Sequence, residues 1–243
     1  MDTTNKRRTI EPMRQAIYFF IISALGSCLI PKASNNPKIG HLHISPMFKN
    51  QPLEIGKTYE MGGGDSIKIA TLRFYISNIT AFSNAQNKFS LAGKYFLIDA
   101  ENTSTLSIPW SDLKKTYDSI SFSIGLDSIT NTSGARGGDL DPSFGMYWTW
   151  NSGYINTKIE GTGSECNTRK KEFTFHLGGY QAPYYGKREI RMALNKKNQQ
   201  TLYIKVDLFL QAMDLKSKPM IMSPCTEAMS AADAFSRSFF MKK

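Results

Sequence analysis

Between Ile39 and Leu210, apolar and polar residues alternate in short runs that are separated by glycine, asparagine, aspartate and proline. Alternation places apolar side chains on one face of an extended strand and polar side chains on the other. With turn residues at regular spacing in parts of this region, the pattern predicts an all-β protein, an antiparallel β-sandwich. The predicted strands are His41–Ile44, Ser66–Ile69, Thr71–Phe82, Tyr95–Asp99, Ser119–Gly125, Met146–Lys158, Glu172–Leu177, Glu189–Leu194 and Thr201–Leu210.

The end of the chain has a different pattern. The segment after Pro224 is rich in alanine and methionine, which favour helices, and a proline is common just before a helix start. Met229, Ala232 and Phe235 follow the i, i+3, i+6 spacing of one helix face. We therefore expect a short C-terminal helix near Thr226–Phe240 that packs on the sandwich.

The N-terminus predicts export. Basic residues precede an apolar run from Ala16 to Leu25, which is the pattern of a signal peptide. The next residues, Gly-Ser-Cys28, complete a sequence similar to the lipobox of bacterial lipoproteins, in which the cysteine is acylated. The alternative is a plain cleaved signal with an incidental cysteine. The expected organisation is a lipoprotein signal peptide at 1–27, a tether at 28–38 and a β-sandwich domain with its helix at 39–243.

This organisation predicts an envelope lipoprotein, held on the membrane by a lipid anchor and facing the periplasm or the outer surface. Composition is that of a globular protein, with 41% hydrophobic and 21% charged residues and a net charge of +10. Export leaves +8, because residues 1–27 carry four basic and two acidic residues. The basic clusters adjoin turn residues and do not alternate with aromatics, so nucleic acid is excluded as a partner. They are Arg169–Lys171, Lys187–Arg188 and Lys196–Lys197.

With Cys28 acylated, two cysteines are left in an oxidising compartment, and Cys166 and Cys225 are a candidate disulfide. Two free thiols, or ligation of copper, are the alternatives. Enzyme motifs are absent from the sequence, which has no Gly-x-Ser-x-Gly, P-loop, His-Glu-x-x-His or Cys-x-x-Cys. We therefore expect a protein that is not an enzyme.

The segment around Trp148 and Trp150 holds two of the chain's three tryptophans. As part of one strand, Met146, Trp148 and Trp150 would share a face. If that face is buried, the segment is a core strand. If it is exposed, Trp148, Trp150 and Tyr154 form a stacking platform for a glycan or another surface ligand. If it lies beside metal ligands, the electron-rich indoles are candidates for oxidation.

The chain has three histidines: His41 and His43, which share one face of a predicted strand, and His176. Imidazole and thioether both suit copper, and thioether favours Cu(I). A site built from His43, His176 and Met146 is chemically reasonable, and the alternative is a structural or surface role for each histidine. The acidic loop from Asp127 to Asp141 offers oxygen ligands for calcium without a recognisable spacing, which favours hydrogen-bonded turn carboxylates instead.

Several segments, in order along the chain, resemble the MbnP-like family, the methanobactin-associated P proteins and related bacterial lipoproteins. The ending Pro219–Pro224 is similar as well. The matching segments are Leu72–Ile79, Tyr95–Asp99, Ser121–Ser128, Gly138–Pro142, Gly145–Tyr154 and Phe175–Gly179.

The resemblance implies a periplasmic or surface β-sandwich that binds copper. In the best-studied branch, a partner related to dihaem cytochrome c peroxidases oxidises a tryptophan to kynurenine, which helps to form the metal site. Trp148 and Trp150 lie in the matching segment and are the candidates for this modification. The proteobacterial branch carries four cysteines, whereas only Cys166 and Cys225 are available here once Cys28 is acylated, so the disulfide scaffold differs.

Overall fold

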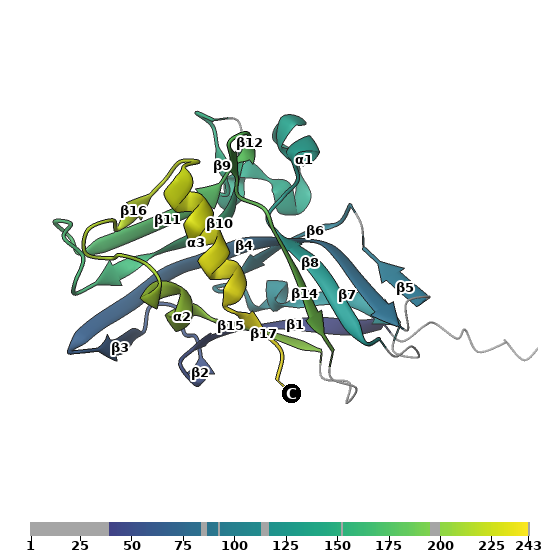
Figure 1. Ribbon diagram of the computed structural model, residues 1–243, viewed down its shortest axis with the longest axis horizontal. Helices are drawn as coiled ribbons and strands as arrows, with labels where there is room; N and C mark the ends of the chain where they lie inside the picture. The colour runs from purple at the N-terminus through teal and green to yellow at the C-terminus, as the bar shows by residue number, and fades with distance from the viewer. Residues whose placement is uncertain are drawn as a thin grey trace, which may run out of the picture. The chain divides into compact units, whose positions relative to one another are not determined.

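A long central strand, β4 (Asp65–Ser83), organises the fold (Figure 1). It is antiparallel to five other strands, which it binds along both of its edges. On one edge lie β10 (Gly153–Gly163) and β8 (Ser119–Ile124), and on the other lie β3 (Thr58–Gly62), β6 (Tyr95–Asp99) and β5 (Asn87–Ser90).

The computed structural model describes residues 39–83, 87–91, 93–112, 117–151, 153–194 and 200–242. They belong to one compact unit, Pro37–Lys243. The predicted signal peptide, Cys28 and the tether lie outside the described residues.

The sheet built on β4 continues outward at both ends. Next to β10 lies β11 (Glu172–Gly178), and β16 (Met220–Ile221) pairs with β11 in parallel. Next to β8 lies β14 (Arg188–Ala193). A two-residue strand, β9 (Tyr147–Trp148), forms a hairpin with the start of β10.

A smaller sheet is centred on β1 (Ile39–Phe48). Its neighbours are β7 (Ser107–Asp112), β2 (Gln51–Pro52) and β15 (Thr201–Lys205), and β17 (Phe239–Phe240) pairs with β15. The β1–β15 pair is parallel, which is possible because more than a hundred and fifty residues connect the two strands, whereas a tight hairpin would make them antiparallel. A separate pair, β12 (Tyr180–Gln181) and β13 (Tyr184–Tyr185), lies near the β9 hairpin.

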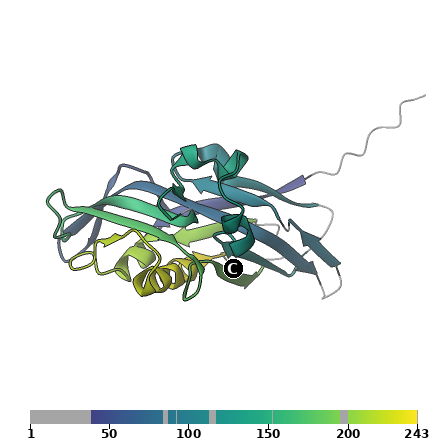
Figure 2. The same cartoon turned by 90° about the horizontal axis from the view of Figure 1, so that it is seen from above.

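Two helices lie between β15 and β17 in the chain. The predicted C-terminal helix is confirmed as α3 (Thr226–Arg237), although its last expected residues form β17 instead. A shorter helix, α2 (Val206–Gln211), precedes it, so the predicted strand Thr201–Leu210 is wrong beyond Lys205. Figure 2 shows α2 and α3 along the same side of the β10–β11 strands. The remaining helical segments are α1 (Ser128–Thr132), η1 (Thr103–Leu106), η2 (Gly138–Leu140) and η3 (Pro142–Phe144).

Side chains of β4 enter a hydrophobic core on each face of the sheet. Phe74 lies in the main core with α3, where its ring contacts Phe235 and Phe239 at centroid distances of 5.4 and 5.8 Å. Tyr75 points the opposite way, into a second core beneath β9 and η2. The predicted β-sandwich is therefore confirmed, with two parallel pairings that the sequence pattern did not predict. Among the described residues, no helix has the length and apolar character needed to cross a membrane.

Candidate functional site

A row of charged and polar residues crosses four neighbouring strands of the larger sheet. In register from one strand to the next lie Asp99 on β6, Arg73 on β4, Lys158 on β10 and His176 on β11. Residues paired across antiparallel strands point to the same face. That face also carries Tyr75, two residues from Arg73, so the row borders the second core.

Two cations of this row hold the turn that leads into the tryptophan segment. Arg73 Nε lies 2.8 Å from Asp99 Oδ2, and Arg73 Nη1 donates to the Phe144 carbonyl at 3.1 Å. Lys158 Nζ donates to the Gly145 carbonyl at 3.4 Å. Because both carbonyls immediately precede Met146, the two cations fix where that segment approaches the sheet.

His176 is buried and has a defined orientation. Its Nε2 atom lies 2.6 Å from Glu160 Oε1. The hydrogen bond with His176 lowers the pKa of Glu160, and the charge of Lys158 lowers it further against the opposing effect of burial. A carboxylate on one imidazole nitrogen is the usual device for orienting a metal-binding histidine through its other nitrogen. Nδ1 is therefore the atom of His176 that a metal would use.

Trp148, on β9, lies on the same face of the sheet as His176. Its ring covers Gly178, the next residue of β11 that faces this way. Only 5% of Trp148 is exposed, and a Cβ on Gly178 would lie 2.5 Å from Cζ3 of the indole. His176 and Gly178 are two residues apart on β11, a separation of about 7 Å along a strand. The fold thus places a buried tryptophan over the strand position that follows the oriented imidazole on the same face.

The second core around Trp148 contains polar atoms as well as apolar ones. Tyr154 Oη accepts from the Arg136 amide and donates to the Leu140 carbonyl, both at 3.0 Å. Among the described residues, Trp148 Nε1 and Tyr75 Oη are buried with no hydrogen-bond partner, and burial raises the pKa of Tyr75. Met146 is fully buried in the same cluster.

The predicted strand Met146–Lys158 is wrong in its first half. The chain turns after Trp148, so the alternation that would place Trp148 and Trp150 on one face ends there. Trp150 is 65% exposed, while its ring centroid lies 5.7 Å from that of Trp148. The predicted stacking platform is also wrong, because Trp148 and Tyr154 are buried. Trp150 instead lines a surface pocket of about 270 Å³ with Tyr180 and Tyr184.

His43 lies away from the other predicted copper ligands. Leu42 and Ile44 point into the main core, so His41 and His43 point outward from the smaller sheet, with ring centroids 6.3 Å apart. His176 points outward from the larger sheet on the far side of that core. A single ion bound by both His43 and His176 is therefore excluded, and only His176 and Met146 share a face. Within the described ranges, no group of three or more histidine, cysteine or acidic side chains is placed to hold a metal.

The acidic loop is built as hydrogen-bonded turns. Asp127 caps α1 by accepting from the Thr130 amide at 2.7 Å, and Asp141 caps η3 through the Ser143 amide at 2.8 Å, which lowers the pKa of Asp141. Asp139 Oδ2 accepts from the Leu97 amide at 3.1 Å. These contacts agree with turn carboxylates, the preferred of the two sequence interpretations.

The predicted disulfide is not formed, and Cys166 and Cys225 are free thiols. Cys166 is buried beside Gly163 at the end of β10, and burial raises its pKa. Cys225 is the N-cap of α3, where its sulfur accepts from the Ala228 amide at 3.3 Å. Each sulfur is held by its own element, which keeps the two apart.

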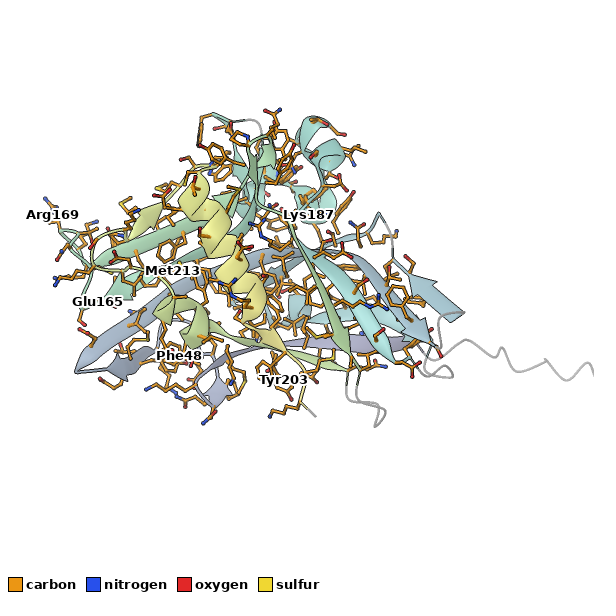
Figure 3. All side chains as sticks on the ribbon, viewed as in Figure 1. Phe48, Glu165, Arg169, Lys187, Tyr203 and Met213 are labelled. Carbon is orange, nitrogen blue, oxygen red and sulfur yellow. The ribbon has the colours of Figure 1, made fainter. Side chains whose placement is uncertain are left out.

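The basic clusters do not gather into one surface. Figure 3 places Arg169 at the tip of the β10–β11 hairpin and Lys187 well away from it, near the start of β14. Arg188 is an ion-pair partner of Asp233 on α3. The predicted cluster Lys196–Lys197 lies outside the described residues.

Sequence reasoning found His176, Met146 and Trp148 but missed Glu160 and the row that ends at His176. A signal was present: Lys158 and Glu160 alternate with buried residues on β10, and Arg73 interrupts an apolar strand. Their mutual register depends on a shift of pairing within β10, which the pattern of one strand does not reveal.

The fold and this site define a class of protein: a β-sandwich domain with a buried tryptophan and an oriented imidazole on one face of its larger sheet. The chain belongs to the MbnP family, whose sequence profile matches residues 38–223. Its structure is similar to that of MbnP from Methylosinus trichosporium, with a TM-score of 0.57 and 11% sequence identity over 79% of this chain and 82% of that one. At this identity the similarity shows a common fold. A search of curated proteins gave no match.

Proposed function

We propose that this protein is a copper-binding accessory protein of the cell envelope, and that Trp148 is the substrate of a dihaem enzyme that oxidises it to kynurenine. The observation that carries the proposal is the burial of Trp148 over Gly178, which lies two residues along β11 from His176 and on the same face as His176 and its Glu160 partner. Membership of the MbnP family supports the copper-related part.

The surroundings of Trp148 favour its modification over that of Trp150. Because Trp148 is buried, oxidants in solution do not reach it, and its oxidation is left to a specific enzyme. Among the described residues, its Nε1 atom has no hydrogen-bond partner, so opening the indole ring breaks no hydrogen bond. In the reaction, two waters supply the oxygens that cleave the indole C2–C3 bond, and four electrons and four protons leave the ring. The electrons pass, two at a time, to the haem irons of the partner, which hydrogen peroxide re-oxidises. A third water then hydrolyses the formyl amide and releases C2 as formate. The product has an aryl amine and a ketone, two groups that can bind a metal where the indole could not.

The residues present fit copper in part. His176 offers Nδ1 and Met146 offers a thioether on the same face, which are ligand types that copper accepts. Oxidised Trp148 would supply further donor atoms at that place. Bound copper would supply redox chemistry, while the chain itself orients His176 through Glu160 and excludes water from the second core.

Modification is tested by producing the protein with and without a dihaem enzyme of the cytochrome c peroxidase type from the same organism. Mass spectrometry of the peptide that spans residues 144–158 should show a product about 4 Da heavier at Trp148. Trp148→Phe should abolish the shift, and Trp150→Phe, a change to the neighbouring exposed ring, should retain it. A shift that survives Trp148→Phe would refute the assignment to Trp148.

Copper binding is tested by titrating the modified wild type, His176→Ala and the double variant His41→Ala/His43→Ala. We expect His176→Ala to weaken binding by about tenfold or more, the scale that even supporting groups of a metal site contribute. The double variant should bind as the wild type does. The reverse result would transfer the copper site to the paired imidazoles of β1.

Lipid anchoring at Cys28 is part of the proposal. Fatty-acid labelling of the wild type and Cys28→Ala in a bacterial host tests it. Labelling that persists unchanged in the variant would exclude acylation of Cys28.

One alternative function has an observation of its own. Trp150 is exposed and lines a pocket with Tyr180 and Tyr184, which is suited to a planar or sugar ligand. Glycan-array binding that is lost in Trp150→Ala but kept in Trp148→Phe would favour this function.

A further inference from the structure

Two exposed methionines lie side by side on the segment between α2 and α3. Ile221 pairs with Phe175 of β11 and is 9% exposed, so its side chain is directed at the main core. Met220 and Met222 flank it and therefore point the other way, with 56% and 44% of each residue exposed. Methionine is an apolar residue that normally lies inside, so an adjacent exposed pair is unusual.

A cysteine lines the same pocket as this pair. Met220, Met222 and Cys225 line one pocket of about 360 Å³, together with the ion pair of Lys218 and Glu227. The sulfur of Cys225 accepts from the Ala228 amide, which fixes its position at the first turn of α3. Glu227 Oε1 lies 2.8 Å from Lys218 Nζ, so the carboxylate of this pocket is already engaged.

Backbone hydrogen bonds anchor both ends of the segment that carries these three residues. The Thr174 amide donates to the Pro219 carbonyl at 2.8 Å, and β16 continues that pairing. On the other side, the Met229 amide donates to the Cys225 carbonyl at 3.1 Å. The methionines are thus fixed to the edge of the larger sheet, and the cysteine to α3.

We propose that Met220, Met222 and Cys225 form a second metal site, which binds Cu(I). Two thioethers and a thiol form a soft donor set, and soft donors select Cu(I) over harder ions. The site is distinct from the one beside Trp148, requires no oxidised tryptophan and does not depend on the proposed function.

The test is an anaerobic titration of the full chain with Cu(I) in competition with a coloured Cu(I) chelator. Cys225→Ser keeps a good helix cap, and Met220→Leu/Met222→Leu keeps side-chain volume, so both variants should fold. Each should lower Cu(I) affinity by about tenfold or more, while Met61→Leu, on β3, and His176→Ala should leave this site unchanged. Equal Cu(I) affinity in the wild type and Cys225→Ser would overturn the proposal.

A second measurement does not depend on affinity. Cu(I) should protect Cys225 of the wild type from alkylation, whereas Cu(I) added to Met220→Leu/Met222→Leu should protect it less. An alkylation rate at Cys225 that is the same with and without Cu(I) would also overturn the proposal. A variant that loses the Trp148-associated copper but keeps this protection, as we expect for His176→Ala, separates this inference from the proposed function.

Discussion

Gly178 lies directly beneath the indole of Trp148. A Cβ at this position would be 2.5 Å from Cζ3 and 2.7 Å from Cη2 of the ring, and 2.8 Å from the Tyr154 carbonyl. The ring is therefore seated on bare backbone, and it can approach β11 only because residue 178 has no side chain. This contact determines how close Trp148 comes to the face that carries His176.

The first prediction tests this contact. Gly178→Ala should lower the free energy of unfolding by about 1 to 3 kcal/mol, because the added methyl overpacks the second core. It should also displace Trp148 and reduce its oxidation by the dihaem partner. Urea denaturation measures the first effect and peptide mass spectrometry the second.

Gly137→Ala is the matched control, since a Cβ at position 137 meets nothing within 4 Å and the backbone there requires no glycine. Its unfolding free energy should stay within about 0.5 kcal/mol of the wild type. Equal stability of the two variants would show that the indole is not seated on Gly178.

The second prediction concerns Glu160 and pH. The pKa of Glu160 is lowered in the folded protein, chiefly by His176, so its carboxylate contributes stability above the unfolded pKa of about 4.3. That contribution is lost as the pH falls below this value and through the lowered folded pKa. Glu160→Gln should therefore be less stable than the wild type at pH 7, and the difference should shrink towards pH 3.

Chemical denaturation at several pH values measures this dependence. Glu189→Gln, a change to an exposed carboxylate on β14, should be close to the wild type throughout. A constant difference between Glu160→Gln and the wild type across this range would contradict the proposed role of the ionised carboxylate.

The third prediction concerns the two thiols. Cys225 should react with iodoacetamide in the folded protein, because it is partly exposed at the start of α3. Cys166 should react only after denaturation, because it is buried and its pKa is raised by burial. Mass spectrometry of peptides alkylated before and after unfolding distinguishes the two, and a Cys166–Cys225 cross-linked peptide would contradict the structure.

Two strands show how much of the fold could be predicted from the sequence. Thr71–Phe82 and Glu172–Leu177 were predicted nearly as they occur within β4 and β11, because alternation along one strand is a local property. The Trp148 segment was not, because aromatic residues continue into the turn and conceal the signal of the turn residues Asn151 and Gly153. Its placement depends on contacts with Gly178 and Arg73 from elsewhere in the chain.

The pairing of His43 with His176 in one copper site is wrong for a related reason. His43 and His176 were paired on ligand chemistry alone, and chemistry does not say which face of which sheet a strand presents. The structure places a hydrophobic core between them, formed in part by Ile44 and Phe175. Pairing between sheets depends on the whole topology, including the parallel β1–β15 pair, which no local pattern predicts.

The last prediction concerns Arg188, which joins α3 to the edge of the larger sheet. From β14 its guanidinium donates through Nε to Asp233, through Nη2 to the Met229 carbonyl at 2.9 Å and through Nη1 to the Tyr185 carbonyl at 2.6 Å. A lysine has one donor group on a flexible stem and cannot make these contacts together. Arg188→Lys should therefore lower the free energy of unfolding by about 1 to 3 kcal/mol. It should also increase hydrogen exchange in α3 more than in β4. Arg191→Lys is the control: among the described residues Arg191 forms no ion pair, and its guanidinium lies over the Phe82 ring, so the change should alter stability by no more than about 0.5 kcal/mol. If exchange in α3 is the same in Arg188→Lys as in the wild type, the guanidinium does not hold the helix to the sheet.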